Sequence, residues 1–201
     1  MTKAETSSKA DGKRRRLITA GLALMEELPY PEITVVMIAE RAEMARSLVF
    51  YYFKDKEELF HHVVRDLLDG LRESFETNDL TVAADNTTAW LRREVGIFLD
   101  FMAAHPRAME TIVALGWQNE RDRVGTTMMD FTAERVHHAF GSPDGGELLD
   151  PALHSWAYHC VDFTLRVHRT APSADPASVI SILVDQAESI FTTLATSLRN
   201  A

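Results

Sequence analysis

Apolar residues recur along this chain every three to four positions, the spacing that gathers them on one face of an α-helix. The N-terminal segment shows this pattern on a face formed by Leu17, Gly21, Leu24, Met25 and Leu28. We find neither the strict alternation typical of a β-strand nor an internal repeat. The pattern therefore predicts an all-α protein.

Helix-ending and capping residues mark the first two helices. Pro29-Tyr30-Pro31 ends the first helix, because proline interrupts the helical hydrogen bonds. Thr34 has the side chain of an N-cap for a short second helix. Ile33 and Ile38, on either side of that cap, have the spacing of a hydrophobic staple.

The remaining helices are delimited in the same way. A short third helix covers 46–53, and Asp55 with Glu58 forms the capping box of a long fourth helix that ends near residue 75. Three further helices end near residues 105, 119 and 140, before a glycine-rich loop over 141–146. Asp150-Pro151 and Asp175-Pro176 each place an acceptor before a proline and open the last two helices. We therefore expect nine helices.

Composition narrows the class of protein. Of the 201 residues, 46% are hydrophobic and 25% are charged, which excludes a disordered tail and a collagen. The single cysteine, Cys160, cannot form an internal disulfide, so we expect a cytoplasmic protein. No stretch of 18 apolar residues is present, so we expect no membrane partner.

The N-terminus resembles a secretory signal, because a basic run at 13–16 precedes an apolar run at 17–25. Thr19 and Gly21 interrupt the apolar run, and no small-residue cleavage site follows it. An amphipathic helix explains this segment better than an export signal.

The net charge of −9 argues against a nucleic-acid partner only if the charge is evenly spread. It is not, because residues 1–60 carry ten basic and ten acidic side chains and are neutral overall. The other 11 basic and 20 acidic side chains carry the whole excess. The first 60 residues therefore remain a candidate for binding DNA.

The spacing over 34–53 suits two short crossing helices that share an apolar seam of Ile38, Ala42, Met44, Val49 and Phe53. The opposite face of the second of these helices carries Arg46, Ser47, Phe50, Tyr51 and Lys54. A guanidinium offers a bidentate fork to guanine, and hydroxyls reach phosphates or base edges, so this face suits the major groove. From the residues alone, an ordinary solvated face explains the pattern equally well.

The strings TVVMIAERA at 34–42, RSLVFYYF at 46–53 and KEEL at 56–59 resemble the helix-turn-helix signature of the tetracycline-repressor (TetR) family. The resemblance implies a flexible basic arm at 1–12, a helix-turn-helix domain at 13–60 and a ligand-binding and dimerisation domain at 61–201. It implies a DNA-binding set of Arg14, Arg15, Thr34, Val35, Arg46, Ser47, Phe50, Tyr51, Tyr52, Lys54 and Lys56. Of these, Lys56 begins the fourth helix, where the ammonium and the helix N-terminus together suit a phosphate.

Three residues depart from the family pattern. Glu43 occupies the turn where the family usually has glycine, so the turn either avoids a positive φ or tolerates it. Ala45 replaces a usual capping Ser or Thr. Phe50 stands where a phosphate-binding tyrosine is common, and it has no hydroxyl group.

The family's C-terminal helices form a dimer, and the last two helices of this chain are compatible with a four-helix bundle between two copies. The alternative is that their broad apolar faces are buried within one chain. The expected interface residues are Val167, Ile180, Leu183, Ala187, Ile190 and Leu194. Such a homodimer would bind an inverted-repeat operator.

Soft and aromatic side chains are concentrated in the middle helices, where an effector of largely apolar character would bind. Ordinary core packing explains the same side chains. The candidate ligand-binding residues are Phe98, Phe101, Met102, Met109, Trp117, Met128, Phe131, Trp156, His159 and Phe163.

Two other function classes remain. Glu58-x-x-His61 and Glu134-x-x-His137 have the spacing of helical-bundle di-iron enzymes, although Glu58 also serves as a capping residue. A DNA-binding protein without an effector is the other alternative, and a screen for compounds that release DNA would distinguish it. We expect a ligand-responsive repressor that is not an enzyme and that uses no metal or cofactor.

Overall fold

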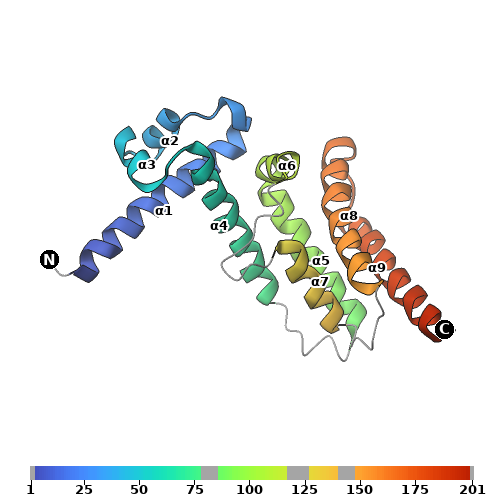
Figure 1. Cartoon of the computed structure of the whole chain (residues 1–201). Coiled ribbons are helices and arrows are strands. Elements are labelled where there is room, and N and C mark those ends of the chain that lie inside the picture. The colour runs from blue at the N-terminus through green and yellow to red at the C-terminus, as the bar shows by residue number, and fades with distance from the viewer. Residues whose placement is uncertain (1–2, 78–85, 117–126, 140–147, 200–201) are drawn as a thin grey trace. The chain divides into compact units, whose positions relative to one another are not determined.

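The computed structural model describes residues 3–77, 86–116, 127–139 and 148–199. Within these ranges the chain forms α-helices and one short 3-10 helix, with no strand (Figure 1). This confirms the expected all-α class and the nine helices. The elements are α1 Lys3–Glu27, η1 Tyr30–Glu32, α2 Val35–Arg41, α3 Arg46–Tyr52, α4 Lys56–Glu76, α5 Thr87–Ala104, α6 Pro106–Ala114, α7 Met128–Ala139, α8 Leu149–Thr170 and α9 Pro176–Arg199.

The predicted start of α2 is confirmed. The backbone N–H of Met37 donates to Thr34 Oγ1 at 3.2 Å, so Thr34 satisfies one of the unpaired donors of the first turn. Ile33 and Ile38 are both buried, as expected of a hydrophobic staple.

The predicted caps of α4 and α9 are also present. The N–H of Glu58 donates to Asp55 Oδ1 at 2.8 Å, and Glu58 Oε2 accepts from the N–H of Lys54 at 2.5 Å, one residue earlier than in a standard capping box. At α9, the N–H of Ser178 donates to Asp175 Oδ2 at 3.2 Å.

Three expected boundaries were wrong. Residues 3–12, expected as a flexible arm, are helical and extend α1 toward the N-terminus. Helix α6 ends at Ala114 rather than near 119, because Gly116 adopts a φ of 73°, the left-handed conformation that closes a helix. Helix α8 begins at Leu149, so Asp150 lies inside its first turn and not at its N-cap. The expected start of α7 near 121 and the loop at 141–146 lie outside the described residues.

The chain divides into two compact units. The first comprises Met1–Asp69 and His105–Glu120, and the second comprises Gly70–Ala104 and Arg121–Ala201. Helix α4 therefore begins in the first unit and ends in the second, and α6 belongs to the first. The core of the first unit is formed by buried side chains from α1 to α4, among them Leu17, Leu24, Ile38, Val49, Phe53, Leu59 and Phe60.

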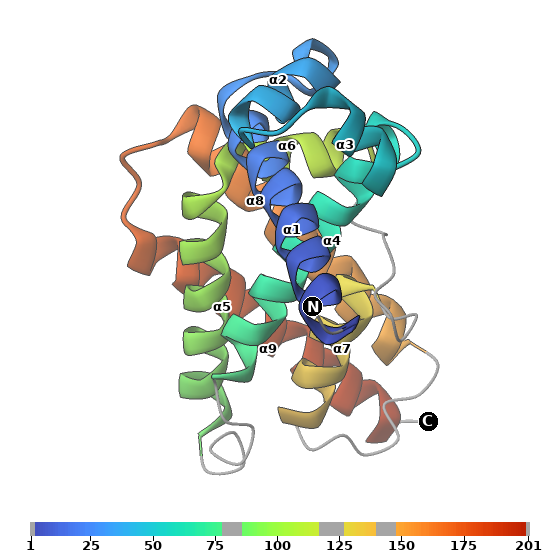
Figure 2. The same cartoon turned by 90° about the vertical axis from the view of Figure 1, so that its left-hand side faces the viewer.

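The first unit depends on a close approach of α1 to α4, whose crossing is visible in Figure 2. A Cβ atom added at Gly21 would lie 2.9 Å from Val63 Cγ2 and 3.0 Å from Leu59 Cδ2. Both distances are shorter than ordinary van der Waals contact, so the crossing requires glycine.

The second unit is a bundle in which α5 packs on α9, α7 on α8 and α8 on α9. The indole N–H of Trp156 donates to the carbonyl of Leu183 at 3.0 Å and joins α8 to α9 through the core. Cys160 is buried in the same cluster, and burial raises the pKa of its thiol. No described helix of the chain has the length and apolar character needed to cross a bilayer.

A buried ion pair joins α5 to α7. Arg135 Nε lies 2.6 Å from Glu94 Oε1, and Arg135 Nη2 donates to the carbonyl of Phe75 at 2.8 Å. Both charged side chains are almost fully buried. The pairing compensates the desolvation of two charges that would be costly to bury separately.

Substituting Gly21 by alanine tests the close approach of α1 to α4. Because the new methyl group would overlap Val63 and Leu59, Gly21→Ala should lower the free energy of unfolding by about 1–3 kcal/mol. Gly70→Ala is the matched control, since nothing lies within 4 Å of a Cβ there, and it should leave stability unchanged or raise it by up to about 1 kcal/mol. Urea unfolding of both variants gives the comparison, and equal effects would contradict the requirement.

The contact between α7 and α8 should make stability depend on pH. His154 Nε2 lies 2.9 Å from Asp130 Oδ1, and this hydrogen bond, with one from the N–H of Thr127, lowers the pKa of Asp130 to about 2. A carboxyl whose folded pKa is depressed stabilises above its unfolded pKa, and that stability is lost as pH falls from about 4 to 2. Asp130→Asn should therefore weaken the loss of stability over this range, and His154→Gln should act in the same direction. Unfolding curves measured at pH 2 to 6 would contradict this if both variants kept the wild-type slope.

Candidate nucleic-acid interface

Helices α2 and α3 share the predicted apolar seam. Ile38, Ala42, Val49 and Phe53 are buried, and Met44 is partly buried. The opposite side of α3 is exposed along Arg46, Ser47, Phe50 and Tyr51, which we call the recognition face. The structure thus brings together on one surface the α3 residues that the sequence predicted to contact DNA.

The turn between the two helices has a positive φ at Glu43, which is one of the two possibilities that the sequence left open. Glu43 has a φ of 53°, its N–H donates to the carbonyl of Glu40 at 3.0 Å, and the N–H of Met44 donates to the carbonyl of Ala39 at 2.8 Å. These two bonds form a Schellman ending, in which glycine is usual at the position of Glu43.

Arg16 supports this turn from α1. Its Nη2 donates to the carbonyl of Ala42 at 2.6 Å and lies 3.4 Å from Glu43 Oε2. The first contact satisfies a carbonyl that the end of α2 leaves unpaired. Arg16 therefore fixes the turn that orients α3.

The missing cap at α3 is confirmed. Ala45 is the N-cap residue of α3 and makes no side-chain hydrogen bond. The first N–H groups of this short helix lack the partner that a Ser or Thr would supply, at a typical cost of about 1 kcal/mol.

The basic side chains near the helix-turn-helix fall into two groups. Four are engaged within the first unit. Arg14 Nη2 lies 2.7 Å from His62 Nε2, Arg41 forms a bidentate pair with Glu27 at 2.6 and 2.8 Å, and Arg16 and Lys56 bind backbone carbonyls. These four contacts hold the unit together, so they explain part of the basic cluster without invoking DNA.

Lys56 has a structural position that the sequence analysis did not anticipate. Its Nζ donates to the carbonyls of Tyr30 and Ile33 at 3.0 and 2.9 Å, and it lies 4.0 Å from the centre of the Tyr30 ring. Burial lowers the pKa of this ammonium. Two of its three donors are thus directed into the protein rather than toward a phosphate.

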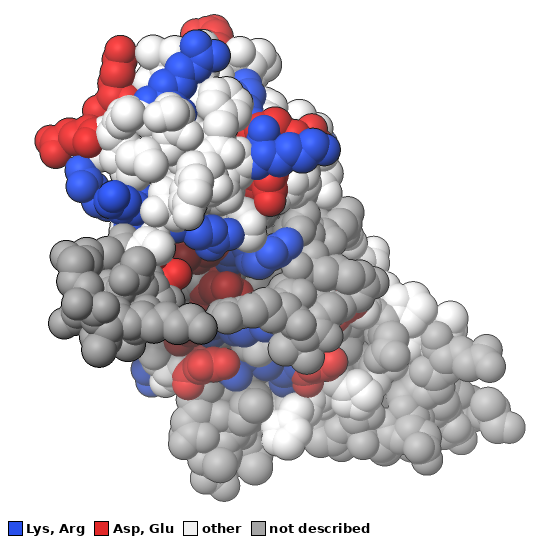
Figure 3. All heavy atoms as spheres, turned by 60° about the vertical axis from the view of Figure 1, so that its left-hand side comes forward, with Lys and Arg blue, Asp and Glu red and all other residues white. Residues whose placement is uncertain are grey.

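The second group of cations is directed to the surface. Lys13, Arg15, Arg46 and Lys54 are exposed, and among the described residues none of them forms an ion pair. Figure 3 shows blue side chains that border an uncharged surface in the upper part of the view, and red side chains border the same surface. A polyanion that lies across this surface would meet the exposed cations at the edge of a neutral centre.

The other predicted contact residues lie around the recognition face. Thr34 is exposed at the start of α2, and Val35 beside it is half-buried. Tyr52 is half-buried and packs edge-to-face on Tyr51 with ring centres 4.9 Å apart.

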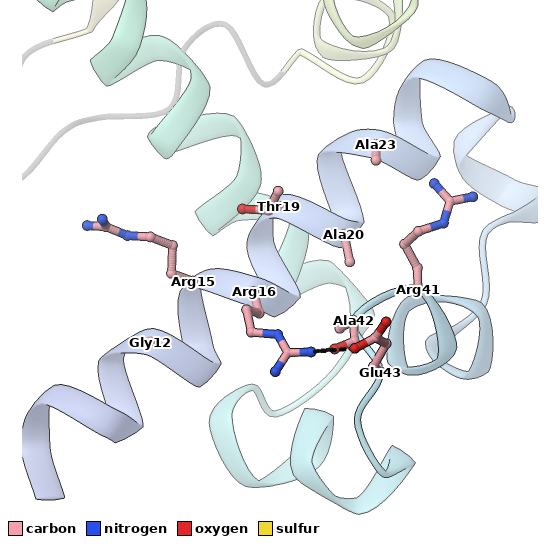
Figure 4. Close-up of a pocket in the computed structure, with 9 residues that line it drawn as sticks. All are labelled: Gly12, Arg15, Arg16, Thr19, Ala20, Ala23, Arg41, Ala42 and Glu43. Atoms are coloured by element: carbon pink, nitrogen blue, oxygen red, sulfur yellow. Dashed lines mark hydrogen bonds and ion pairs between the residues drawn. The ribbon is translucent and has the colours of Figure 1, made fainter.

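A groove of about 490 Å³ lies between α1 and the C-terminal end of α2 (Figure 4). It is lined by Gly12, Arg15, Arg16, Thr19, Ala20, Ala23, Arg41, Ala42 and Glu43. Arg15 points away from Arg16 and Arg41 in Figure 4, and the latter two are bound to acceptors within the unit. The three guanidinium groups therefore do not converge on one anion.

The predicted ligand-binding residues are dispersed. Met102, Met128 and Trp156 are buried, Phe98 and Phe163 pack against the core of the second unit, and His159 is exposed. Met109 is buried in the first unit, so it lies in a different part of the chain from the others. Phe101 and Phe131 are partly buried, and Trp117 lies outside the described residues.

The predicted dimer residues differ in availability. Leu183 and Ala187 are fully buried within the core of the single chain. Val167, Ile180 and Ile190 are partly exposed. The side chain of Leu194 lies outside the described part of the chain. The apolar stripe was wide enough to include both kinds of residue, and periodicity alone could not separate them.

The structure also gives exposed side chains that the sequence analysis did not name. Tyr158 on α8 and Ile182 on α9 are large, apolar and exposed. Polar residues lie four positions away on the same side of each helix, His154 and Asp162 for Tyr158 and Ser178 and Gln186 for Ile182, and this spacing is the signal that could have identified them.

The described residues contain no group of three or more His, Cys, Asp or Glu side chains that could hold a metal ion. Glu58 accepts from the backbone at the start of α4, and His61 lies near Glu57. Both side chains of this Glu-x-x-His pair thus make local contacts at the start of α4.

Comparison with known proteins finds a family likeness in the N-terminal part of the chain. Residues 17–63 match the model of bacterial regulatory proteins of the tetR family. The HTH-type transcriptional regulator BetI of Cronobacter sakazakii is 31% identical over 98 residues, which cover 49% of this chain and 48% of BetI. The chain therefore aligns with about half the length of this relative.

Solved structures extend the likeness of the fold to most of the chain. A tetR-family transcriptional regulator from Streptomyces coelicolor superposes with a TM-score of 0.74 and 19% identity, covering 93% of this chain and 83% of the regulator. A second such regulator, from Syntrophomonas wolfei, gives a TM-score of 0.64 and 14% identity, with coverages of 90% and 96%.

The two lysines at the start of α4 should behave differently. Lys56→Met would leave the carbonyls of Tyr30 and Ile33 without their buried donor, so it should lower the free energy of unfolding by about 1–3 kcal/mol. Lys54→Met is the matched control at an exposed site and should change stability by less than about 0.5 kcal/mol. Denaturant unfolding measures both, and an equal loss at Lys54 would refute the structural role of Lys56.

Proposed function

Because this chain belongs to the tetR family of bacterial regulatory proteins, we propose that it regulates transcription by binding double-stranded DNA through α3. The observation that carries the proposal is the recognition face, which exposes Arg46, Ser47 and Tyr51 on a short helix whose other side is anchored in the core. A helix of this kind can enter the major groove and present its side chains to base edges.

Contacts of two kinds follow from this placement. Arg46 offers two parallel N–H donors to a guanine, while the hydroxyls of Ser47 and Tyr51 reach base edges or phosphates. Lys13, Arg15 and Lys54 contact the phosphate backbone, since their charges are exposed and unpaired among the described residues. Thr34, Val35 and Tyr52 border this footprint.

Arg14 and Lys56 take a supporting role in this proposal. Each is bound within the first unit, Arg14 beside His62 and the ring of Phe53, and Lys56 beneath the Tyr30–Ile33 backbone. They hold α1 and α4 where α3 packs, and direct contact with DNA is not required of them.

The operator in this proposal is an inverted repeat bound by a homodimer. The partly exposed apolar residues Val167, Ile180 and Ile190, with Tyr158 and Ile182, support an interface on α8 and α9. Two-fold symmetry would then place two copies of α3 about 34–36 Å apart, in successive major grooves on one side of the duplex.

The proposed effector is a small and largely apolar molecule that binds the second unit. It releases DNA if it binds better to a conformation in which the two copies of α3 have the wrong separation. The protein then acts as a repressor in the cytoplasm, where it meets the chromosome. The Met and aromatic side chains of α5 and α7 support this part of the proposal.

DNA binding can be tested by selection from a random duplex library at moderate salt. We expect enrichment of an inverted repeat whose half-site centres lie about 10 bp apart, or a multiple of that distance. Lys54→Ala should weaken binding to every selected sequence, and it should reduce the slope of log affinity against log salt by about 1 for each protomer.

Arg93→Ala is the control for this measurement. It removes one exposed charge from α5 in the second unit and should leave the salt slope unchanged. Failure to enrich any sequence, together with equal salt slopes for the wild type and Lys54→Ala, would refute the proposed function.

A further inference from the structure

The helix-turn-helix exposes apolar surface where a purely electrostatic DNA contact would need none. Phe50 is 48% exposed and Val36 is 41% exposed, although the first unit buries the large apolar side chains of its core. Covering an exposed phenyl ring with an apolar group is favourable in water. In the major groove, the apolar group on the base edges is the C5 methyl of thymine.

Phe50 is coupled to Arg46. The two residues are four positions apart and share one side of α3, and the guanidinium carbon of Arg46 lies 5.6 Å from the centre of the Phe50 ring. This cation–π contact limits the positions available to the guanidinium. A phenyl ring cannot donate a hydrogen bond, so Phe50 supports the arginine without competing for the same acceptors.

The contact between the two side chains limits which base pairs they can reach together. The guanidinium carbon and the ring centre are 5.6 Å apart, which is less than two base-pair steps of about 3.4 Å each. Side chains that touch each other therefore reach the same base pair or adjacent ones. Arg46 supplies the bidentate donors that distinguish guanine, and Phe50 supplies the surface that fits a methyl group.

We propose that Phe50 determines sequence specificity by contacting the C5 methyl of a thymine next to the guanine that Arg46 binds. This inference rests on the proposed DNA-binding function and adds to it the identity of the base next to the guanine. Each half-site of the operator then contains adjacent guanine and thymine, and the methyl group itself contributes to affinity.

The test replaces thymine by deoxyuridine in the selected operator, one position at a time, because this removes only the methyl group. At one thymine in each half-site we expect a loss of about fourfold in affinity, and about fifteenfold when both half-sites are changed. Cytosine at the same position should also bind weakly, and 5-methylcytosine should bind more tightly than cytosine.

Phe50→Ala provides the protein side of the test. It should bring the ratio of thymine to uracil affinity close to one at that position, while a folded domain is verified by its helical circular dichroism. Phe50→Leu should retain part of the ratio. Leu115→Ala, at an exposed apolar residue at the end of α6, is the matched control and should keep the ratio near fourfold.

The outcomes separate this inference from the function on which it rests. If a sequence is selected but uracil binds as well as thymine at every position, or if the ratio persists in Phe50→Ala, the inference is wrong and DNA recognition stands. If no sequence is selected, both are overturned.

Discussion

The first unit depends on the absence of one side chain, at Gly21, where α1 crosses α4. Because no Cβ atom lies between the two helices, Leu59 and Val63 approach the backbone of α1. The core formed there supports the seam of α2 and α3 from behind. Packing on the opposite side of the helix therefore determines the direction in which α3 presents Arg46. A contact with DNA is not needed to set this direction.

The cations of the same unit fall into two groups, those bound within the protein and those exposed at its surface. Arg14, Arg16, Arg41 and Lys56 bind groups of the protein itself, and this leaves only a few charges for a polyanion. The net charge of −9 is thus a poor guide to partners, because a neutral N-terminal segment can still expose unpaired cations. With few such cations, we expect weak non-specific attraction to DNA and an affinity that depends on contacts that distinguish one sequence from another.

Local signals in the sequence predicted local structure well. Thr34, Asp55 and Asp175 were identified as caps because a cap and its partner lie within three residues of each other. The end of α6 was placed too late because the sequence does not show which glycine adopts a positive φ, as Gly116 does. The exposed side of α3 followed from helical periodicity.

Contacts distant in sequence could not be predicted in this way. Lys56 meets carbonyls 23 and 26 residues earlier, and Arg135 meets Glu94 across 41 residues. Glu94 lies on the buried side of its helix, which indicates that a charged partner exists. The sequence does not show which residue that partner is.

The positive φ of Glu43 has an evolutionary consequence. A single base change converts a glutamate codon to a glycine codon, and Arg16 would keep its bond to the Ala42 carbonyl, so the turn lies one mutation from relieving about 1 kcal/mol of backbone strain.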